Sequence, residues 1–162
     1  ITRLALDTAR AAGGLGPLEG HMRAGFLLPL SDDTTALRVE FSHGFEDHSD
    51  ERLRLPLHGS FAGEALAAGR ALIVERNDLA KWNRSLSRPE DRWVRKMVWS
   101  EARWLICIPF CHTPSDTKLV LAIDGNRDLA LASKLLEPTL TSLSDHLVTM
   151  LDKGLPKELF EW

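Results

Sequence analysis

An alternation of apolar and polar residues marks the first strands of this chain. Apolar residues recur at every second position over 37–41, a period that is typical of a strand with one face in water. The apolar run 22–30 precedes them across a short polar turn, so the two segments predict a β-hairpin. Alternation resumes at 53–57, where Pro56 lacks the N–H that a central strand needs. This segment is therefore expected at an edge of a sheet or in an extended connection.

A short helix and a short strand follow this segment. Ser60 is a residue type that caps helices, the segment 61–68 suits a helix, and Gly69 is the residue type that ends one. The apolar segment 71–74 then predicts a strand.

The rest of the chain adds helices and a second hairpin. The apolar runs 104–110 and 119–123 flank a polar turn and predict this hairpin. Helical patterns over 1–12 and 128–153 predict a helix near each end of the chain. The segment 76–102 contains a capping box and predicts a helical excursion between two strands.

This order of elements favours an α/β (α+β) fold and a single domain over 1–162. We expect a central antiparallel sheet of about five to six strands within 22–125. The helices at the two ends are expected on one face of the sheet. The segment 76–102 is expected to lie over the other face as a helical lid.

Composition and charge exclude several classes of protein. Hydrophobic residues make up 44% of the chain, which is too apolar for a disordered protein. The longest apolar run, Trp104 to Cys111, has eight residues, whereas a membrane-spanning helix needs about 20. The net charge of -3 disfavours nucleic acid as the main partner. Two cysteines are too few for a disulfide scaffold, so we expect a cytoplasmic protein without a membrane partner.

Three segments, taken in order, resemble the pieces of a GAF domain. Residues 55–74 (LPLHGSFAGEALAAGRALIV) resemble the glycine turn, short helix and following strand of that family. Residues 100–110 (SEARWLICIPF) and 119–125 (LVLAIDG) resemble its paired strands. The resemblance runs from about Met22 to Leu151, and it implies a sensory or signalling module that binds a small molecule.

Two positions of the resembling stretch have a direct physical interpretation. Gly59 permits a tight turn, and the small Ala62–Gly63 pair allows the short helix to approach the sheet closely. The signature of GAF domains that bind cyclic nucleotides is absent, so the resemblance does not imply that ligand.

The segment 76–102 falls where GAF domains place the lid over their ligand pocket. Residues 76–104 contain four of the five tryptophans and eight Lys or Arg against four Asp or Glu. Guanidinium groups bind carboxylate or phosphate, and indoles offer stacking faces, so this composition suits an anionic or aromatic ligand. The competing interpretation is a solvated basic face with tryptophans packed in the core. The candidate ligand-binding residues are Trp82, Arg84, Trp93, Arg95, Trp99 and Arg103.

Cys107 and Cys111 make a redox enzyme the alternative. Some GAF proteins reduce free methionine sulfoxide with pocket cysteines, although these two do not match that arrangement residue by residue. On one extended strand they would lie about 13 Å apart, too far for a disulfide, which needs Cα atoms within about 7 Å. Buried, inert thiols are the competing interpretation.

Other chemistry lacks support in the sequence. No nucleophile elbow, dinucleotide-binding loop or Walker loop is present. Cys111-His112 lies at the end of a predicted strand, whereas bilin-binding GAF domains attach their chromophore on a helix. We therefore expect no catalytic residue, no cofactor and no metal.

The helix at 128–153 carries a stripe of leucines, at positions 136, 140, 143, 147 and 151. If this stripe is wider than the sheet needs, its surplus would pair with a second copy. We expect a non-catalytic regulatory domain that binds a small molecule and signals through its terminal helices, as a homodimer. GAF domains often occur in tandem with output domains, so the resemblance implies an output domain outside this chain. A ligand-free dimerisation scaffold is a further alternative.

Overall fold

The computed structural model describes the sheet, one helix and part of the connections between them. It covers residues 20–29, 35–45, 54–77, 100–112 and 117–128, together with single helical residues near the two ends of the chain: Arg3, Asp7, Pro138, Thr139, Ser142, Asp145, His146 and Thr149.

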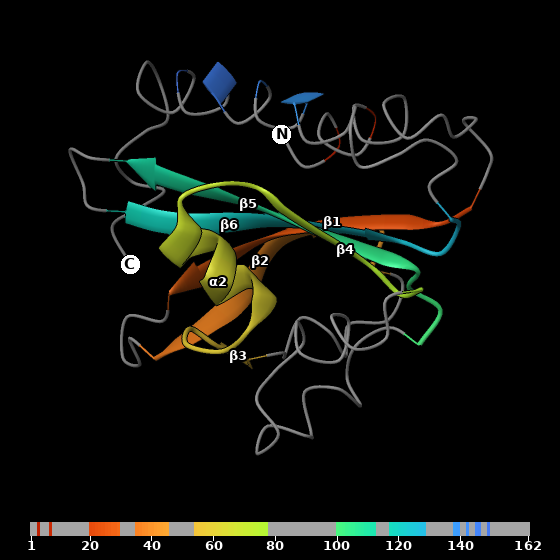
Figure 1. Cartoon of the computed structure of the whole chain (residues 1–162), viewed down its shortest axis with the longest axis horizontal. Coiled ribbons are helices and arrows are strands. Elements are labelled where there is room, and N and C mark those ends of the chain that lie inside the picture. Colours follow the sequence, from red (N-terminus) through yellow and green to blue (C-terminus); the bar gives the residue numbers. More distant parts are fainter. Residues whose placement is uncertain are drawn as a thin grey trace.

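Six strands form one antiparallel sheet in the order β3-β2-β1-β6-β5-β4 (Figure 1). The strands are β1 (Met22–Pro29), β2 (Ala36–His43), β3 (Arg54–Pro56), β4 (Leu72–Glu75), β5 (Trp104–His112) and β6 (Thr117–Gly125). The two predicted hairpins, β1–β2 and β5–β6, are both antiparallel pairs. The α+β class is therefore confirmed, and Pro56 lies in an edge strand as its missing N–H requires.

The strands that come first and last in the sequence, β1 and β6, are neighbours at the centre of the sheet. β1 pairs with β6 over the register from Met22 opposite Gly125 to Leu27 opposite Val120. This pairing joins a β1–β2–β3 unit to a β4–β5–β6 unit. Both the entry to β1 and the exit from β6 therefore lie at the same end of the sheet.

The helix α2 (Phe61–Ala68) begins and ends where the sequence predicts. The hydroxyl of Ser60 accepts a hydrogen bond from the backbone N–H of Gly63 at 3.1 Å, and Gly69 ends the helix in the left-handed conformation (φ 61°). A Cβ added at Gly63 would overlap the carbonyl oxygen of Leu57. Ala62 lies buried against the sheet with Cys107 and Val120, as predicted, and Gly63 permits an additional close approach to the turn after β3.

Both faces of the sheet are buried. The face that carries α2 buries Leu27, Leu37, Phe61, Ala62, Ala65, Val74, Cys107 and Val120. The opposite face buries Met22, Ala24, Trp104, Ile106, Ile108, Phe110, Leu121 and Ile123. Burial on both sides explains why β5 is apolar from Trp104 to Phe110, without the alternation of β2.

The pairing of β1 with β2 contains an irregularity that the alternating pattern does not reveal. Ala24 lies opposite His43 and Phe26 opposite Glu40, so one residue of β1 faces two residues of β2. This β-bulge includes Phe41, which has a φ of 50° and is 51% exposed. The bulge thus removes Phe41 from the apolar face on which Leu37 lies buried.

Single described residues near both ends of the chain are helical, and the extent of the helices predicted over 1–12 and 128–153 stays a prediction. The side chain of Thr149 donates to the carbonyl of Asp145 at 2.8 Å, a contact one helical turn back. The packing of these helices and of the 76–102 segment on the sheet involves residues outside those described, and it stays a prediction. Among the described residues, no helix is long and apolar enough to cross a membrane.

Candidate functional site

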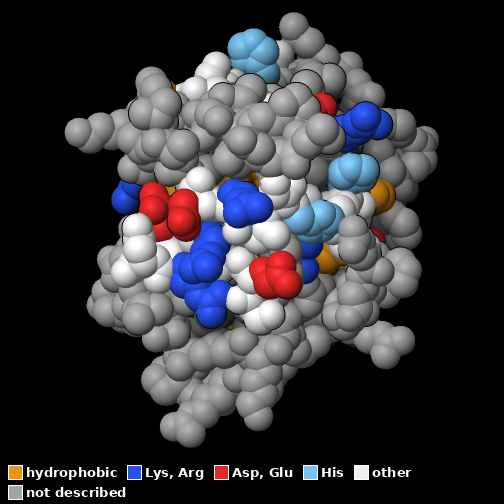
Figure 2. All heavy atoms as spheres, turned by 90° about the vertical axis from the view of Figure 1, so that its right-hand side faces the viewer, with side chains coloured by type: hydrophobic (Ala, Val, Ile, Leu, Met, Phe, Trp, Pro, Cys, Tyr) orange, Lys and Arg blue, Asp and Glu red, His pale blue; other side chains and the backbone are white. Residues whose placement is uncertain are grey.

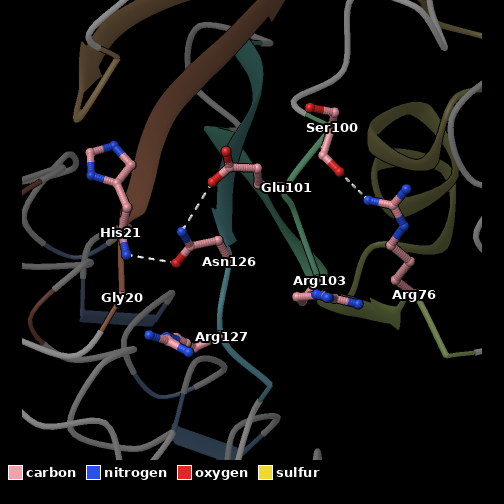
Figure 3. A pocket seen from close by; sticks show the side chains of 8 residues that line it. All are labelled: Gly20, His21, Arg76, Ser100, Glu101, Arg103, Asn126 and Arg127. Carbon is pink, nitrogen blue, oxygen red and sulfur yellow. Dashed lines mark hydrogen bonds between the residues drawn. The ribbon is translucent and has the colours of Figure 1, made fainter.

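Four segments distant in the sequence meet at one end of the sheet. They are the entry to β1, the end of β4, the residues that lead into β5 and the residues that follow β6. Together they line an open groove with a volume of about 750 Å³ (Figure 3). The lining residues are Gly20, His21, Arg76, Ser100, Glu101, Arg103, Asn126 and Arg127.

Backbone hydrogen bonds fix the position of these segments. The N–H of Arg76 donates to the carbonyl of Arg103, and the N–H of Arg103 donates to that of Gly125, each at 2.7 Å. The N–H of Asn126 donates to His21 at 3.1 Å, and the Asn126 side-chain oxygen accepts from the His21 N–H at 2.7 Å. The groove therefore rests on an extension of the sheet itself, and its side chains start from a rigid backbone.

Arg76 closes the 76–102 segment at its base. Its Nη1 atom donates to the carbonyl of Ser100 and, at 3.2 Å, to that of Ala102. Figure 3 shows this side chain pointing from the end of β4 toward Ser100. One guanidinium thus holds together the two ends of the segment that the sequence predicts as a lid.

Arg103 and Arg127 bring two further positive charges to the groove. Both residues are exposed. Among the described residues, no carboxylate pairs with either guanidinium and no hydrogen bond satisfies it. Figure 2, which looks onto this end of the sheet, shows Lys and Arg side chains gathered beside a few acidic and His side chains.

The remaining lining groups are polar, and one is acidic. Glu101 accepts a hydrogen bond from the amide of Asn126 at 3.4 Å. The Nε2 atom of His21 lies 2.6 Å from the carbonyl of Gly44, so this ring nitrogen carries a proton and donates. Three arginines against one carboxylate make the groove chemically suited to an anion.

The structure describes one of the six candidate ligand-binding residues, Arg103, and it lies in the groove. Trp82, Arg84, Trp93, Arg95 and Trp99 lie outside the described residues. Sequence reasoning did not select Arg127, which follows β6 and lies at the same end of the sheet as Arg103 because β6 pairs with β5. Arg76 belongs to the basic segment noted from the sequence, but no pattern in the sequence predicted that its side chain would join the two ends of that segment.

A second charged group lies on the α2 face of the sheet. Arg23 donates from Nε to Asp124 at 2.9 Å and from Nη2 at 2.5 Å, and both side chains are largely buried. The guanidinium carbon of Arg23 also lies 4.5 Å from the ring centroid of Phe45. Because each charge has a partner, this pair is suited to holding β1 against β6.

Cys107 lies near this ion pair on the same face. Its side chain is fully buried and forms no disulfide. Burial raises the pKa of the Cys107 thiol well above its usual range, and the negative charge of Asp124 raises it further. A thiol that stays protonated and has no access to solvent is not suited to nucleophilic chemistry. The side chain of Cys111 lies outside the described residues.

No protein-family model matches the chain, and no curated protein matches it in sequence. Solved structures do match its fold. The GAF domain of a two-component sensor histidine kinase from Bacillus halodurans superposes with a TM-score of 0.59 at 17% identity, covering 99% of this chain and 97% of that chain.

Two other similar structures have different biochemistry. Free methionine-R-sulfoxide reductase from Neisseria meningitidis, solved with its substrate, has a TM-score of 0.55 at 18% identity, covering 94% of this chain and 80% of that chain. A Staphylococcus aureus NreA protein mutated in its nitrate binding site has a TM-score of 0.51 at 15% identity, covering 82% and 91%. At these identities the likeness concerns the fold alone, and this chain has a GAF-like fold.

Proposed function

We propose that this chain is a non-catalytic regulatory domain that binds a small molecule at the sheet-end groove and passes the signal to its terminal segments. One observation carries the proposal. The groove contains the junction into β1, the junction out of β6 and both ends of the 76–102 segment. A ligand bound there would contact both terminal junctions and the two ends of the 76–102 segment.

The physical basis is a shift between arrangements of these segments. A ligand can favour one arrangement only if it binds that arrangement more tightly than another. His21 and Asn126 are tied to each other by two hydrogen bonds, and a ligand that touches this pair would fix both terminal junctions together. Signalling through the terminal helices, the homodimer, the output domain and the cytoplasmic location remain part of this proposal.

The tryptophan-rich segment completes the proposed site. Trp82, Arg84, Trp93, Arg95 and Trp99 lie between Arg76 and Ser100 in the sequence, and Arg76 holds the two ends of this segment together. We place these five residues with Arg103 in the ligand site, where the arginines would supply charge and the indoles would cover the ligand.

Hydrogen exchange measured with and without a metabolite library tests the proposal. Binding at the groove should slow amide exchange around residues 20–21 and 126–127 and in both terminal segments. The variant Arg103→Gln should weaken this response, whereas Arg70→Gln, an exposed arginine outside the groove, should not. A purified dimer whose hydrogen exchange changes with no member of the library would favour the dimerisation scaffold and contradict the proposal.

A redox enzyme is the second candidate, because the similar structures include free methionine-R-sulfoxide reductases. The burial of Cys107 and its raised pKa weigh against it. Assay of free methionine sulfoxide reduction by the wild type, Cys107→Ser and Cys111→Ser decides between the two. Activity that is lost in either variant would establish the enzyme, and no activity in the wild type would leave the binding domain.

A further inference from the structure

We propose that the groove binds the phosphate ester of a small polyhydroxylated metabolite, with Arg103 and Arg127 holding the phosphate. This inference rests on the proposed function and names the chemical class of its ligand. Four observations support it: the unpaired guanidiniums, their origin on neighbouring strands, the polar lining and the size of the groove.

Arg103 and Arg127 have no carboxylate partner among the described residues, although each is a permanent cation. Two arginines within the strands are paired with acids, Arg23 with Asp124 and Arg38 with Glu40. Arg76 adds a third positive charge at the same end of the sheet. An anion is the missing partner, and charge-assisted hydrogen bonds to it would be among the stronger ones in the site.

The placement of the two arginines distinguishes phosphate from carboxylate. Arg103 precedes β5 and Arg127 follows β6, so their side chains start from two neighbouring strands. One guanidinium can satisfy both oxygens of a carboxylate in a bidentate pair. A phosphate monoester has three terminal oxygens and close to two negative charges at neutral pH. It therefore offers an oxygen to each of the two guanidiniums, whose side chains start from separate strands.

The polar lining describes the rest of the ligand. Of the eight described lining residues, seven have polar side chains, including the imidazole of His21, and the eighth is Gly20, so these residues favour a polar body. Glu101 presents carboxylate oxygens and Asn126 an amide beside the arginines, and Figure 3 shows both between His21 and Arg103. Carboxylate and amide groups are suited to hydroxyl groups, because they accept and donate hydrogen bonds. A sugar or polyol is the body that these groups recognise.

The size of the groove favours an occupant larger than a bare inorganic ion. Its volume is about 750 Å³, within the range of roughly 300–1,000 Å³ that small-molecule sites show. An inorganic phosphate would leave most of this space to water. A phosphorylated sugar would place its hydroxyls against Glu101 and Asn126 while its phosphate meets the two arginines.

Isothermal titration calorimetry with matched probes tests the proposal. The phosphorylated probes are glycerol 3-phosphate, ribose 5-phosphate and glucose 6-phosphate, and the neutral partners are glycerol, ribose and glucose. Gluconate supplies a polyhydroxylated carboxylate, and inorganic phosphate supplies the bare anion. We expect at least one sugar phosphate to bind at least tenfold more tightly than its neutral partner, gluconate and inorganic phosphate.

Variants assign the binding to the groove. Arg103→Gln and Arg127→Gln should each weaken the sugar phosphate at least tenfold, whereas Arg70→Gln should leave its affinity unchanged. Because the two groove arginines are exposed, the variants are expected to fold, and circular dichroism and thermal melting confirm this. Binding that survives the double variant Arg103→Gln/Arg127→Gln would overturn the proposal.

The remaining outcomes separate the ligand class from the proposed function. Tightest binding of gluconate would replace phosphate by carboxylate, and tightest binding of inorganic phosphate would show a simple anion site. If no sugar phosphate binds, the phosphate-ester proposal falls. In that case, slower hydrogen exchange at the groove with another library member would preserve the regulatory function, and its absence with every member would remove both.

Discussion

The interface between helix α2 and the rest of the fold is lined by small and apolar residues, whereas the sheet-end groove is lined by polar and charged residues. At α2, small and apolar residues exclude water, and Gly63 lies so close to the Leu57 carbonyl that no larger side chain fits. At the groove, all eight lining residues are polar or glycine, and two guanidiniums have no partner within the described chain. The α2 interface is fully packed by its own residues, whereas the positive charge of the groove arginines has no negative partner among the described residues.

This difference separates residues needed for folding from residues kept for binding. A buried contact contributes to the free energy of unfolding through the apolar area it removes from water. Exposed, unpaired cations contribute little to that free energy and repel one another. If the comparison is right, stability should respond strongly to changes at α2 and barely to changes of the groove arginines.

The largest effect is expected for Gly63→Ala. The added Cβ overlaps the Leu57 carbonyl oxygen, and backbone on both sides leaves no easy relief, so the free energy of unfolding should fall by roughly 3 kcal/mol. Urea denaturation measures it. Gly69→Ala is the matched control, because space around Gly69 is open and only its left-handed φ of 61° is strained, a cost of about 1 kcal/mol. Equal losses of unfolding free energy in the two variants would contradict the tight contact between Gly63 and the Leu57 carbonyl.

A smaller loss in the free energy of unfolding is expected for Trp104→Phe. The residue Trp104 links the core to the groove. Trp104 is buried, and its indole N–H donates to the carbonyl of Arg127 at 2.7 Å. Loss of ring volume and of this hydrogen bond should cost about 2 kcal/mol in urea denaturation.

Gly125→Ala supplies the control for the ring of Trp104. An added Cβ at Gly125 would overlap that ring, so the substitution should be less costly in the Trp104→Phe variant than in the wild type. Additive costs in this double-mutant cycle would show that the ring and Gly125 are not in contact.

The pH dependence of stability tests whether the α2 face is dry beside the Arg23–Asp124 pair. Burial, and secondarily Asp124, raise the pKa of Cys107 in the folded chain. In the unfolded chain the thiol ionises near its ordinary pKa of about 8.5. Above that pH the unfolded state has lost a proton that the folded state keeps, so stability falls as pH rises, by about 1 kcal/mol per pH unit. Cys107→Ala should show a shallower decline between pH 8 and 10. Parallel declines would mean that Cys107 is hydrated.

The smallest effect on stability is expected for Arg103→Gln/Arg127→Gln. Neither guanidinium has a described partner, so the free energy of unfolding should change by less than about 0.5 kcal/mol. Thermal melting at low and high salt checks this value and the relief of repulsion. A loss above about 1 kcal/mol would show that these arginines support the fold, and it would remove the contrast with α2.

Local features of the fold could be predicted from the sequence because they depend on neighbouring residues. Ser60 and Gly69 define α2 through short-range hydrogen bonds, and the period of two in β2 follows from a strand with unequal faces. The bulge at Phe41 escaped the pattern, because a single extra residue changes the facing of a side chain without changing its neighbours in sequence.

The groove could be predicted only in part, because it depends on which strands are adjacent. His21 and Asn126 are separated by 105 positions and meet only because β1 pairs with β6. Arg103 could be selected because it ends a basic, tryptophan-rich segment. Arg127 has no such context, and its role follows from the position of β6 beside β5.

The central pairing of β1 with β6 also sets the order in which the chain can acquire this site. A contact that spans about a hundred residues closes late, because a long loop must be ordered before the contact contributes any free energy. During synthesis, β1 stays unpaired on one side until β6 has been made. The groove exists only after β1 has paired with β6. Any molecule that binds the groove therefore recognises the assembled sheet and stabilises the folded state.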